Sequence, residues 1–123
     1  MANEPKQKRF GAHIRALREA QEISLRKFAE RAQISPTYLS KVERDEFPPP
    51  GEEAVRRIAD ILGEDPDELL ALAGKVASDL PGIIQQHPRA MATFLRAASG
   101  LPAAEIEKLA RRAVGLRKKG PEK

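Results

Sequence analysis

A short polar segment, residues 36–43, carries the residue types best suited to a binding site. Ser35 and Pro36 predict the start of a helix, because a serine hydroxyl caps free amides and proline fits the first helical position. Leu39 and Val42 then fall on its inward face. The outward face is polar and basic: Thr37, Tyr38, Ser40 and Lys41. Since lysine donates to guanine and a threonine methyl contacts thymine, this face predicts contact with DNA bases, with Ser40 on a base or a phosphate. The alternative is an ordinary solvated helix face.

The start of the preceding helix suits a phosphate group. Ser24 predicts an N-cap, and the free amides and dipole of a helix start favour an anion. Arg26 and Lys27 add two cations beside it. Further phosphate contacts are expected from Ser35, Arg9 and Arg44, and from Lys6 and Lys8 in an N-terminal arm. For each single arginine or lysine, the alternative is an ordinary surface charge.

The net charge of +4 is distributed unevenly along the chain. Residues 1–44 carry 10 Lys and Arg against 5 Asp and Glu, a net charge of +5. Residues 45–75 carry 3 against 9, a net of −6, and residues 76–123 carry 9 against 4, a net of +5. The positive charge therefore lies on the half that carries the candidate DNA contacts and on the tail, where it would attract phosphate.

Patterns for catalysis and metal binding are missing from the sequence. The two histidines, His13 and His87, are far apart and lack the spacing of metal ligands. The chain has no His-Glu-x-x-His motif, glycine-rich phosphate loop or Gly-x-Ser-x-Gly elbow. Its lack of cysteine excludes disulfides and thiolate zinc sites. We therefore expect no enzyme activity and no cofactor or metal.

Five helices are expected to position the candidate contacts. They cover about residues 9–21, 25–32, 36–43, 52–62 and 66–74, each with an apolar stripe at helical spacing. Three prolines at 48–50 predict a loop, because proline cannot continue a helix. Gly63 is the expected C-cap of the fourth helix. The expected fold class is all-α, and the first domain should span residues 1–75, including a disordered arm.

The remaining residues, 76–123, are expected to form about three short helices and a basic disordered tail. Three short helices with narrow apolar stripes cannot bury all of their apolar residues among themselves. We therefore predict that a second copy of the chain covers the excess and that these helices form a dimerisation module. The alternative is that these helices pack back on the first domain. The predicted interface residues are Ile83, Ile84, Met91, Phe94, Leu95, Ile106 and Leu109.

Over residues 8–75 the chain resembles the helix-turn-helix family of phage repressors, Cro and their chromosomal relatives, the XRE family. The resemblance is carried, in order, by Phe10–Glu19, Ala29, Ile34, Leu39–Glu43, Pro48–Pro50, Val55, Ile58, Ala59, Leu62, Gly63 and Asp65–Leu70. Two positions depart from the family pattern. Gln33 stands where the turn often has glycine, and Leu25 stands where the family often has a glutamine that contacts DNA.

The resemblance implies a sequence-specific regulator of transcription that binds double-stranded DNA as a homodimeric repressor on a two-fold operator. It also implies a structural ion pair between Arg18 and Glu43, which ties the end of the helix at residues 36–43 to the first helix, at residues 9–21. The implied location is the cytoplasm of a prokaryote, at the nucleoid. No apolar run approaches the roughly 20 residues that span a bilayer, so no membrane partner is expected.

A second class of function stays open at this stage. The chain would then be an interaction protein whose carboxy-terminal helices bind a partner. One such protein is an antitoxin that neutralises a toxin. Another is a repressor that a dedicated protease inactivates by cleaving its helical tail. A neighbouring gene for a toxin or a protease would distinguish these alternatives from a simple repressor.

Overall fold

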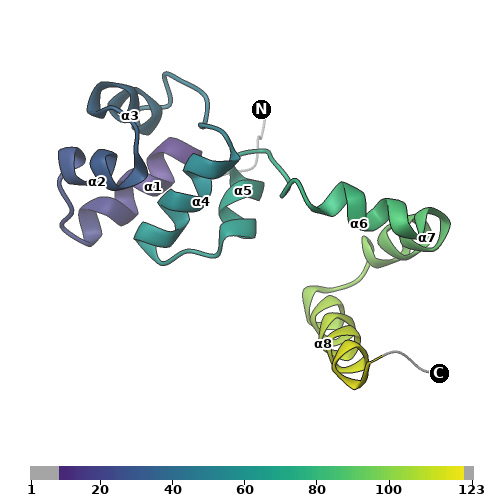
Figure 1. Ribbon diagram of the computed structural model, residues 1–123. Helices are drawn as coiled ribbons and strands as arrows, with labels where there is room; N and C mark the ends of the chain where they lie inside the picture. Colours follow the sequence, from purple (N-terminus) through teal and green to yellow (C-terminus); the bar gives the residue numbers. More distant parts are fainter. Residues whose placement is uncertain (1–8, 121–123) are drawn as a thin grey trace, which may run out of the picture. The chain divides into compact units, whose positions relative to one another are not determined.

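The computed structural model describes residues 9–120, and these form eight α-helices without a strand (Figure 1). The expected all-α class is therefore confirmed. The N-terminal arm with Lys6 and Lys8, and the end of the basic tail, lie outside the described residues. The helices are α1 (Phe10–Ala20), α2 (Leu25–Ala32), α3 (Pro36–Glu43), α4 (Glu52–Leu62), α5 (Pro66–Leu72), α6 (Leu80–Gln86), α7 (Pro88–Ala98) and α8 (Ala103–Lys119).

The chain divides into two compact units, one ending at Ser78 and one beginning at Asp79. The first unit contains α1–α5 and extends three residues beyond the boundary expected after Lys75. Two of these three residues, Ala77 and Ser78, make contacts within the first unit. Ala77 is buried against its core, and the Ser78 amide donates to the Glu52 carboxylate at 3.2 Å. This second contact joins the end of the unit to the start of α4.

Side-chain caps start three helices where the sequence predicts them. Ser24 Oγ accepts from the Lys27 amide at 3.1 Å, and Ser35 Oγ accepts from the Tyr38 amide at 3.0 Å. Asp65 does the same for the amide of Glu68 at α5. Each cap satisfies an amide that has no partner inside its helix. The directions in which α2 and α3 begin are therefore set by local sequence.

The core of the first unit lies where α1, α2 and α3 meet α4 and α5. Phe28 from α2 and Leu39 from α3 are fully buried there. Ala29 and Ala32 are also fully buried, so two small residues let α2 approach its neighbours closely. Since Leu39 and Val42 anchor the inner face of α3, its other face is left for solvent or a ligand. The largest buried side chains are Phe28, Ile14, Leu39, Ile58, Leu69, Leu70, Val42 and Val55.

The turn between α2 and α3 holds Gln33 in the left-handed conformation, with φ 63° and ψ 40°. A residue with a Cβ pays roughly 1–2 kcal/mol there. We expect Gln33→Gly to raise the free energy of unfolding by about 1 kcal/mol, less than the full strain because glycine loses more backbone entropy on folding. Urea unfolding measures this change. Gln33→Ala keeps the strain and is the matched control; an equal gain in both variants would contradict the explanation.

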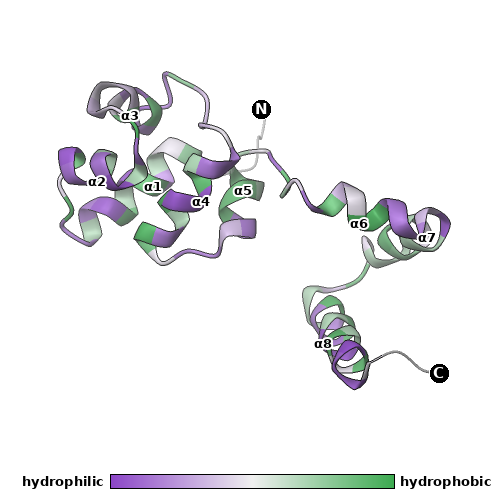
Figure 2. Cartoon of the chain, viewed as in Figure 1, coloured by the Kyte–Doolittle hydropathy of each residue, from purple (hydrophilic) through white to green (hydrophobic). Residues whose placement is uncertain are grey.

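The second unit leaves most of its apolar surface uncovered. Within residues 79–120 only Ala98 is buried, although α6 packs on α7. The helix α8 has 17 residues and is longer than expected. Hydrophobic and hydrophilic positions alternate along it (Figure 2), yet none of its residues is buried. The exposed large apolar side chains of this unit are Leu80, Ile83, Phe94, Leu95, Leu101, Ile106, Leu109, Val114 and Leu116.

In the part of the chain that the structure describes, no helix has the length and apolar character needed to cross a membrane.

Candidate nucleic-acid interface

The predicted base contacts on the outer face of α3 differ in how far they are exposed to solvent. Thr37 is exposed, whereas Ser40 and Lys41 are half-buried. Tyr38 was expected to point outward, but it is also half-buried and packs against the core. Its large ring extends over the edge of the core and meets the ring of Phe47, with centroids 6.0 Å apart and planes at 49°. Contact between Tyr38 and DNA would therefore involve the free edge of the side chain.

Phe47, in the loop after α3, belongs to this surface although the sequence reasoning did not select it. The Lys41 ammonium nitrogen lies 5.4 Å from the centroid of the Phe47 ring. The amides of Glu46 and Phe47 both donate to the Lys41 carbonyl oxygen, at 2.9 and 3.3 Å. These bonds fold the loop back onto the end of α3. The sequence signal was a single aromatic residue between two acidic residues and three prolines in the loop after α3.

Arg44 follows α3 and contacts two polar neighbours. Its guanidinium donates to Ser40 Oγ at 2.7 Å and to the Glu46 carboxylate at 2.9 Å. The hydrogen bond with Glu46 raises the pKa of Arg44, and the same bond lowers the pKa of the Glu46 carboxyl. A phosphate approaching Arg44 would therefore compete with an existing carboxylate partner.

The start of α2 lies beside this face. Arg26 and Lys27 are exposed, while Leu25 is half-buried. Leu25 lines a shallow hollow together with residues of α3, so an apolar side chain occupies the position where the family often has glutamine. The other residues lining this hollow are Pro36, Thr37, Ser40, Lys41 and Arg44. The structure thus brings Leu25, at the start of α2, together with three of the four predicted base contacts, and Tyr38 is not among the lining residues.

Arg9 immediately precedes α1 and is exposed. It lines a different hollow, with Ala12, His13 and Ala16. There His13 Nε2 lies 2.8 Å from a carboxylate oxygen of Glu64, which joins α1 to the loop before α5. The structure therefore groups Arg9 with α1 residues and does not bring it into the hollow of α2 and α3.

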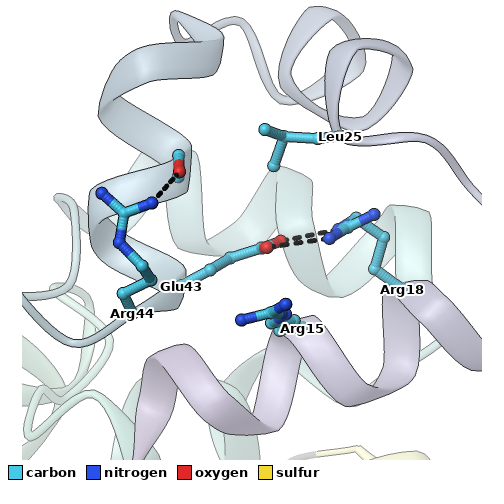
Figure 3. A pocket seen from close by; sticks show the side chains of 6 residues that line it. Arg15, Arg18, Leu25, Glu43 and Arg44 are labelled. Carbon is cyan, nitrogen blue, oxygen red and sulfur yellow. Dashed lines mark hydrogen bonds and ion pairs between the residues drawn. The ribbon is translucent and has the colours of Figure 1, made fainter.

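A buried ion pair fixes the end of α3 to α1. Arg18 Nε and Nη2 donate to the two Glu43 carboxylate oxygens at 2.8 and 3.0 Å (Figure 3). Arg18 Nη1 donates to the Ile23 carbonyl oxygen at 2.8 Å. Only 9% of Arg18 and 4% of Glu43 is exposed. The hydrogen bond that Arg18 donates to Glu43 raises the pKa of Arg18, and the bidentate geometry fixes both side chains.

A close backbone approach fixes the same end a second time. The Gly11 amide donates to Asp45 Oδ1 at 3.0 Å. A Cβ at Gly11 would collide with the Val42 carbonyl oxygen, so only glycine allows α1 to lie this close to α3. The end of α3 is therefore anchored to α1 by two separate contacts, while the Ser35 cap only sets where the helix begins.

Within residues 9–120, no three His, Cys, Asp or Glu side chains gather into a group that could hold a metal ion. The hollows lined by α2 and α3 instead carry hydroxyl, ammonium and guanidinium groups. These are donors, and their natural partners are base edges and phosphate oxygens.

Comparison with protein families gives a match to the helix-turn-helix domain over residues 9–72, just over half of the chain. No curated protein matches the chain. Several solved structures are similar to the chain, including the following three. The N-terminal DNA-binding domain of SinR from Bacillus subtilis shares 28% identity and has a TM-score of 0.46, covering 50% of this chain and 88% of that one. The biofilm master regulator SinR in complex with DNA gives the same identity and TM-score, covering 50% and 97%. The clp gene regulator ClgR from Corynebacterium glutamicum shares 27% identity with a TM-score of 0.46, covering 92% of each chain.

Proposed function

The chain belongs to the Cro-like helix-turn-helix family of DNA-binding transcription regulators, and we propose that α3 is the helix with which it reads its operator. The observation that carries this proposal is the anchoring of α3. Its inner face is buried, its C-terminal end is tied to α1, and its outer face carries polar side chains. A helix held in this way can enter the major groove without reorganising. The proposed base contacts are Thr37, Tyr38, Ser40 and Lys41.

The phosphate contacts in this proposal come mainly from the α2 start. Ser24, Arg26 and Lys27 surround the positive end of the helix dipole, and the side chains of Arg26 and Lys27 are exposed. Arg44 is a further candidate, because it lines the same hollow as Thr37 and Lys41. Ser35 and Arg9 complete the set. Such contacts orient the protein on DNA without selecting a sequence.

The second unit makes the protein a homodimer in this proposal, so that it acts as a repressor on a two-fold operator. Its exposed apolar side chains are too numerous for a helical unit that stands alone. Along α8, Ile106, Leu109, Ala113 and Leu116 repeat at spacings of three and four, the pattern of a helix-pairing seam. Ile83, Ile84, Met91, Phe94 and Leu95 complete the proposed interface.

The same exposed surface also favours a second candidate, in which unit two binds a different protein such as a toxin or a protease. The two candidates differ in oligomeric state, because a chain that waits for another partner is monomeric by itself. Light scattering on the purified full chain separates them. In either case the chain acts by binding, and not by catalysis.

The proposal is tested by selecting bound duplexes from random DNA with the full chain. The expected result is a two-fold consensus whose half-sites are about one helical turn apart. The selected duplex then serves for all binding measurements. Recovery of unrelated sequences without a consensus would contradict sequence-specific reading.

Lys41→Ala should weaken binding to the selected duplex and relax the preference at one base pair. The expected loss is roughly 1 to 3 kcal/mol if Lys41 makes a bidentate base contact. The comparison is with a scrambled duplex at the same salt concentration. An equal loss on both duplexes would make Lys41 a phosphate contact, and no loss on either would remove it from the interface.

Arg26→Ala and Lys27→Ala should weaken binding to all sequences almost equally. Each should also reduce the slope of log affinity against log salt by about one, because one fewer phosphate is neutralised. Titrations at several salt concentrations measure the slope. Arg31→Ala, an exposed arginine at the other end of α2, is the matched control. An unchanged slope in the Arg26, Lys27 double variant would contradict the phosphate site.

A further inference from the structure

We propose that Phe47 is a positioning residue for DNA recognition, which holds Lys41 over its ring and so prepares that lysine to read a base. The inference rests on the proposed function of α3. It adds a residue from the following loop to the recognition surface, through its contacts with Lys41 and Tyr38.

The exposure of Phe47 requires an explanation. Phe47 is 42% exposed, and it is a large apolar residue beside the polar side chains of Ser40, Lys41 and Arg44. It is also held in place by backbone bonds, since the amides of Glu46 and Phe47 donate to the Lys41 carbonyl oxygen. The ring therefore stands next to the α3 face as a fixed feature of the loop.

The contact between the Phe47 ring and Lys41 orders the lysine side chain. A lysine side chain is long and flexible, so ordering it on binding costs entropy. The face of an aromatic ring attracts an ammonium group within about 6 Å, and the Lys41 nitrogen lies 5.4 Å from the Phe47 centroid. Lys41 is thus ordered before DNA arrives. The Tyr38 ring also packs against the Phe47 ring, with centroids 6.0 Å apart.

Two substitutions at position 47 distinguish the effect of an aromatic face from the effect of apolar side-chain volume. Phe47→Leu keeps an apolar side chain but removes the aromatic face, whereas Phe47→Trp keeps and enlarges it. Phe47→Leu should lower discrimination at the base pair read by Lys41 by about two- to fivefold, the size of an exposed cation–π contact. Phe47→Trp should keep that discrimination. The salt slope and the unfolding curve should not change in either variant.

A double-mutant cycle with Lys41→Met is the deciding experiment, using the selected duplex and its single-base variants. If Phe47 acts through Lys41, Phe47→Leu has no further effect once Lys41 is replaced. An equal effect in both backgrounds would overturn the proposal, because Phe47 would then act on DNA directly. Equal discrimination in wild type and Phe47→Leu would overturn it as well. If instead Lys41→Met alone leaves the base preference unchanged, the proposed base contact of Lys41 fails first, and this outcome is distinct from a failure of Phe47 to position the lysine.

Discussion

Glu43→Leu is expected to lower the free energy of unfolding of the first unit by about 3 to 5 kcal/mol, because it leaves the Arg18 guanidinium buried without its partner. This is a large part of the total stability of a small domain, which is about 5 to 15 kcal/mol. The chain contains one tyrosine and no tryptophan, and that tyrosine, Tyr38, lies on α3. Tyrosine fluorescence during urea unfolding therefore reports on the first unit within the full chain.

The control for this variant removes the second charge too. In Arg18→Met with Glu43→Leu, two apolar side chains replace the pair, and most of the lost stability should return. The Ile23 carbonyl, which loses a donor, is half-exposed and can bond to water. A loss below about 1 kcal/mol for Glu43→Leu alone would contradict the argument, since that is the behaviour of an exposed ion pair.

Removal of the second unit should produce the largest effect on DNA binding. A fragment ending at Ser78 keeps Ala77 in the core and the bond from Ser78 to Glu52. We expect it to fold, to be largely monomeric at micromolar concentration, and to bind the full operator about 100-fold or more weakly. The reason is that the second half-site no longer benefits from a tethered copy. Light scattering and duplex titration measure the two effects.

A full-length variant tests the same interface without truncation. Phe94→Ala with Leu95→Ala removes two exposed apolar side chains of α7 and should reproduce the fragment in both measurements. Gln85→Ala with Gln86→Ala, at two exposed polar positions of α6, is the matched control and should stay dimeric. A fragment that remains a dimer would place the interface in the first unit.

Local sequence predicted the helices well, because their starts depend on near neighbours. Ser24, Ser35 and Asp65 cap helices within three residues of themselves, and Gly63 ends α4 in the left-handed conformation, as expected. The family resemblance supplied the one distant contact that was predicted, between Arg18 and Glu43.

Other contacts could not be read from the sequence, because each depends on how a loop folds back. The Phe47 ring reaches Lys41 only because two loop amides bond to the Lys41 carbonyl oxygen. The pairing of Arg44 with Glu46 follows from the same turn. The importance of Gly11 appears only when α1 meets the end of α3. These contacts determine which polar groups of the interface are free.

The contacts that hold α3 in place are separate from the side chains on its outward face. Leu39, Val42 and Glu43 hold the helix, while the residues that face outward take no part in the core packing, apart from the half-buried ring of Tyr38. Evolution can therefore recode the outward face towards a new operator without refolding the scaffold. If Phe47 positions Lys41 as proposed, a face grafted onto α3 should carry Phe47 with it, because the Lys41 ammonium nitrogen lies over the Phe47 ring.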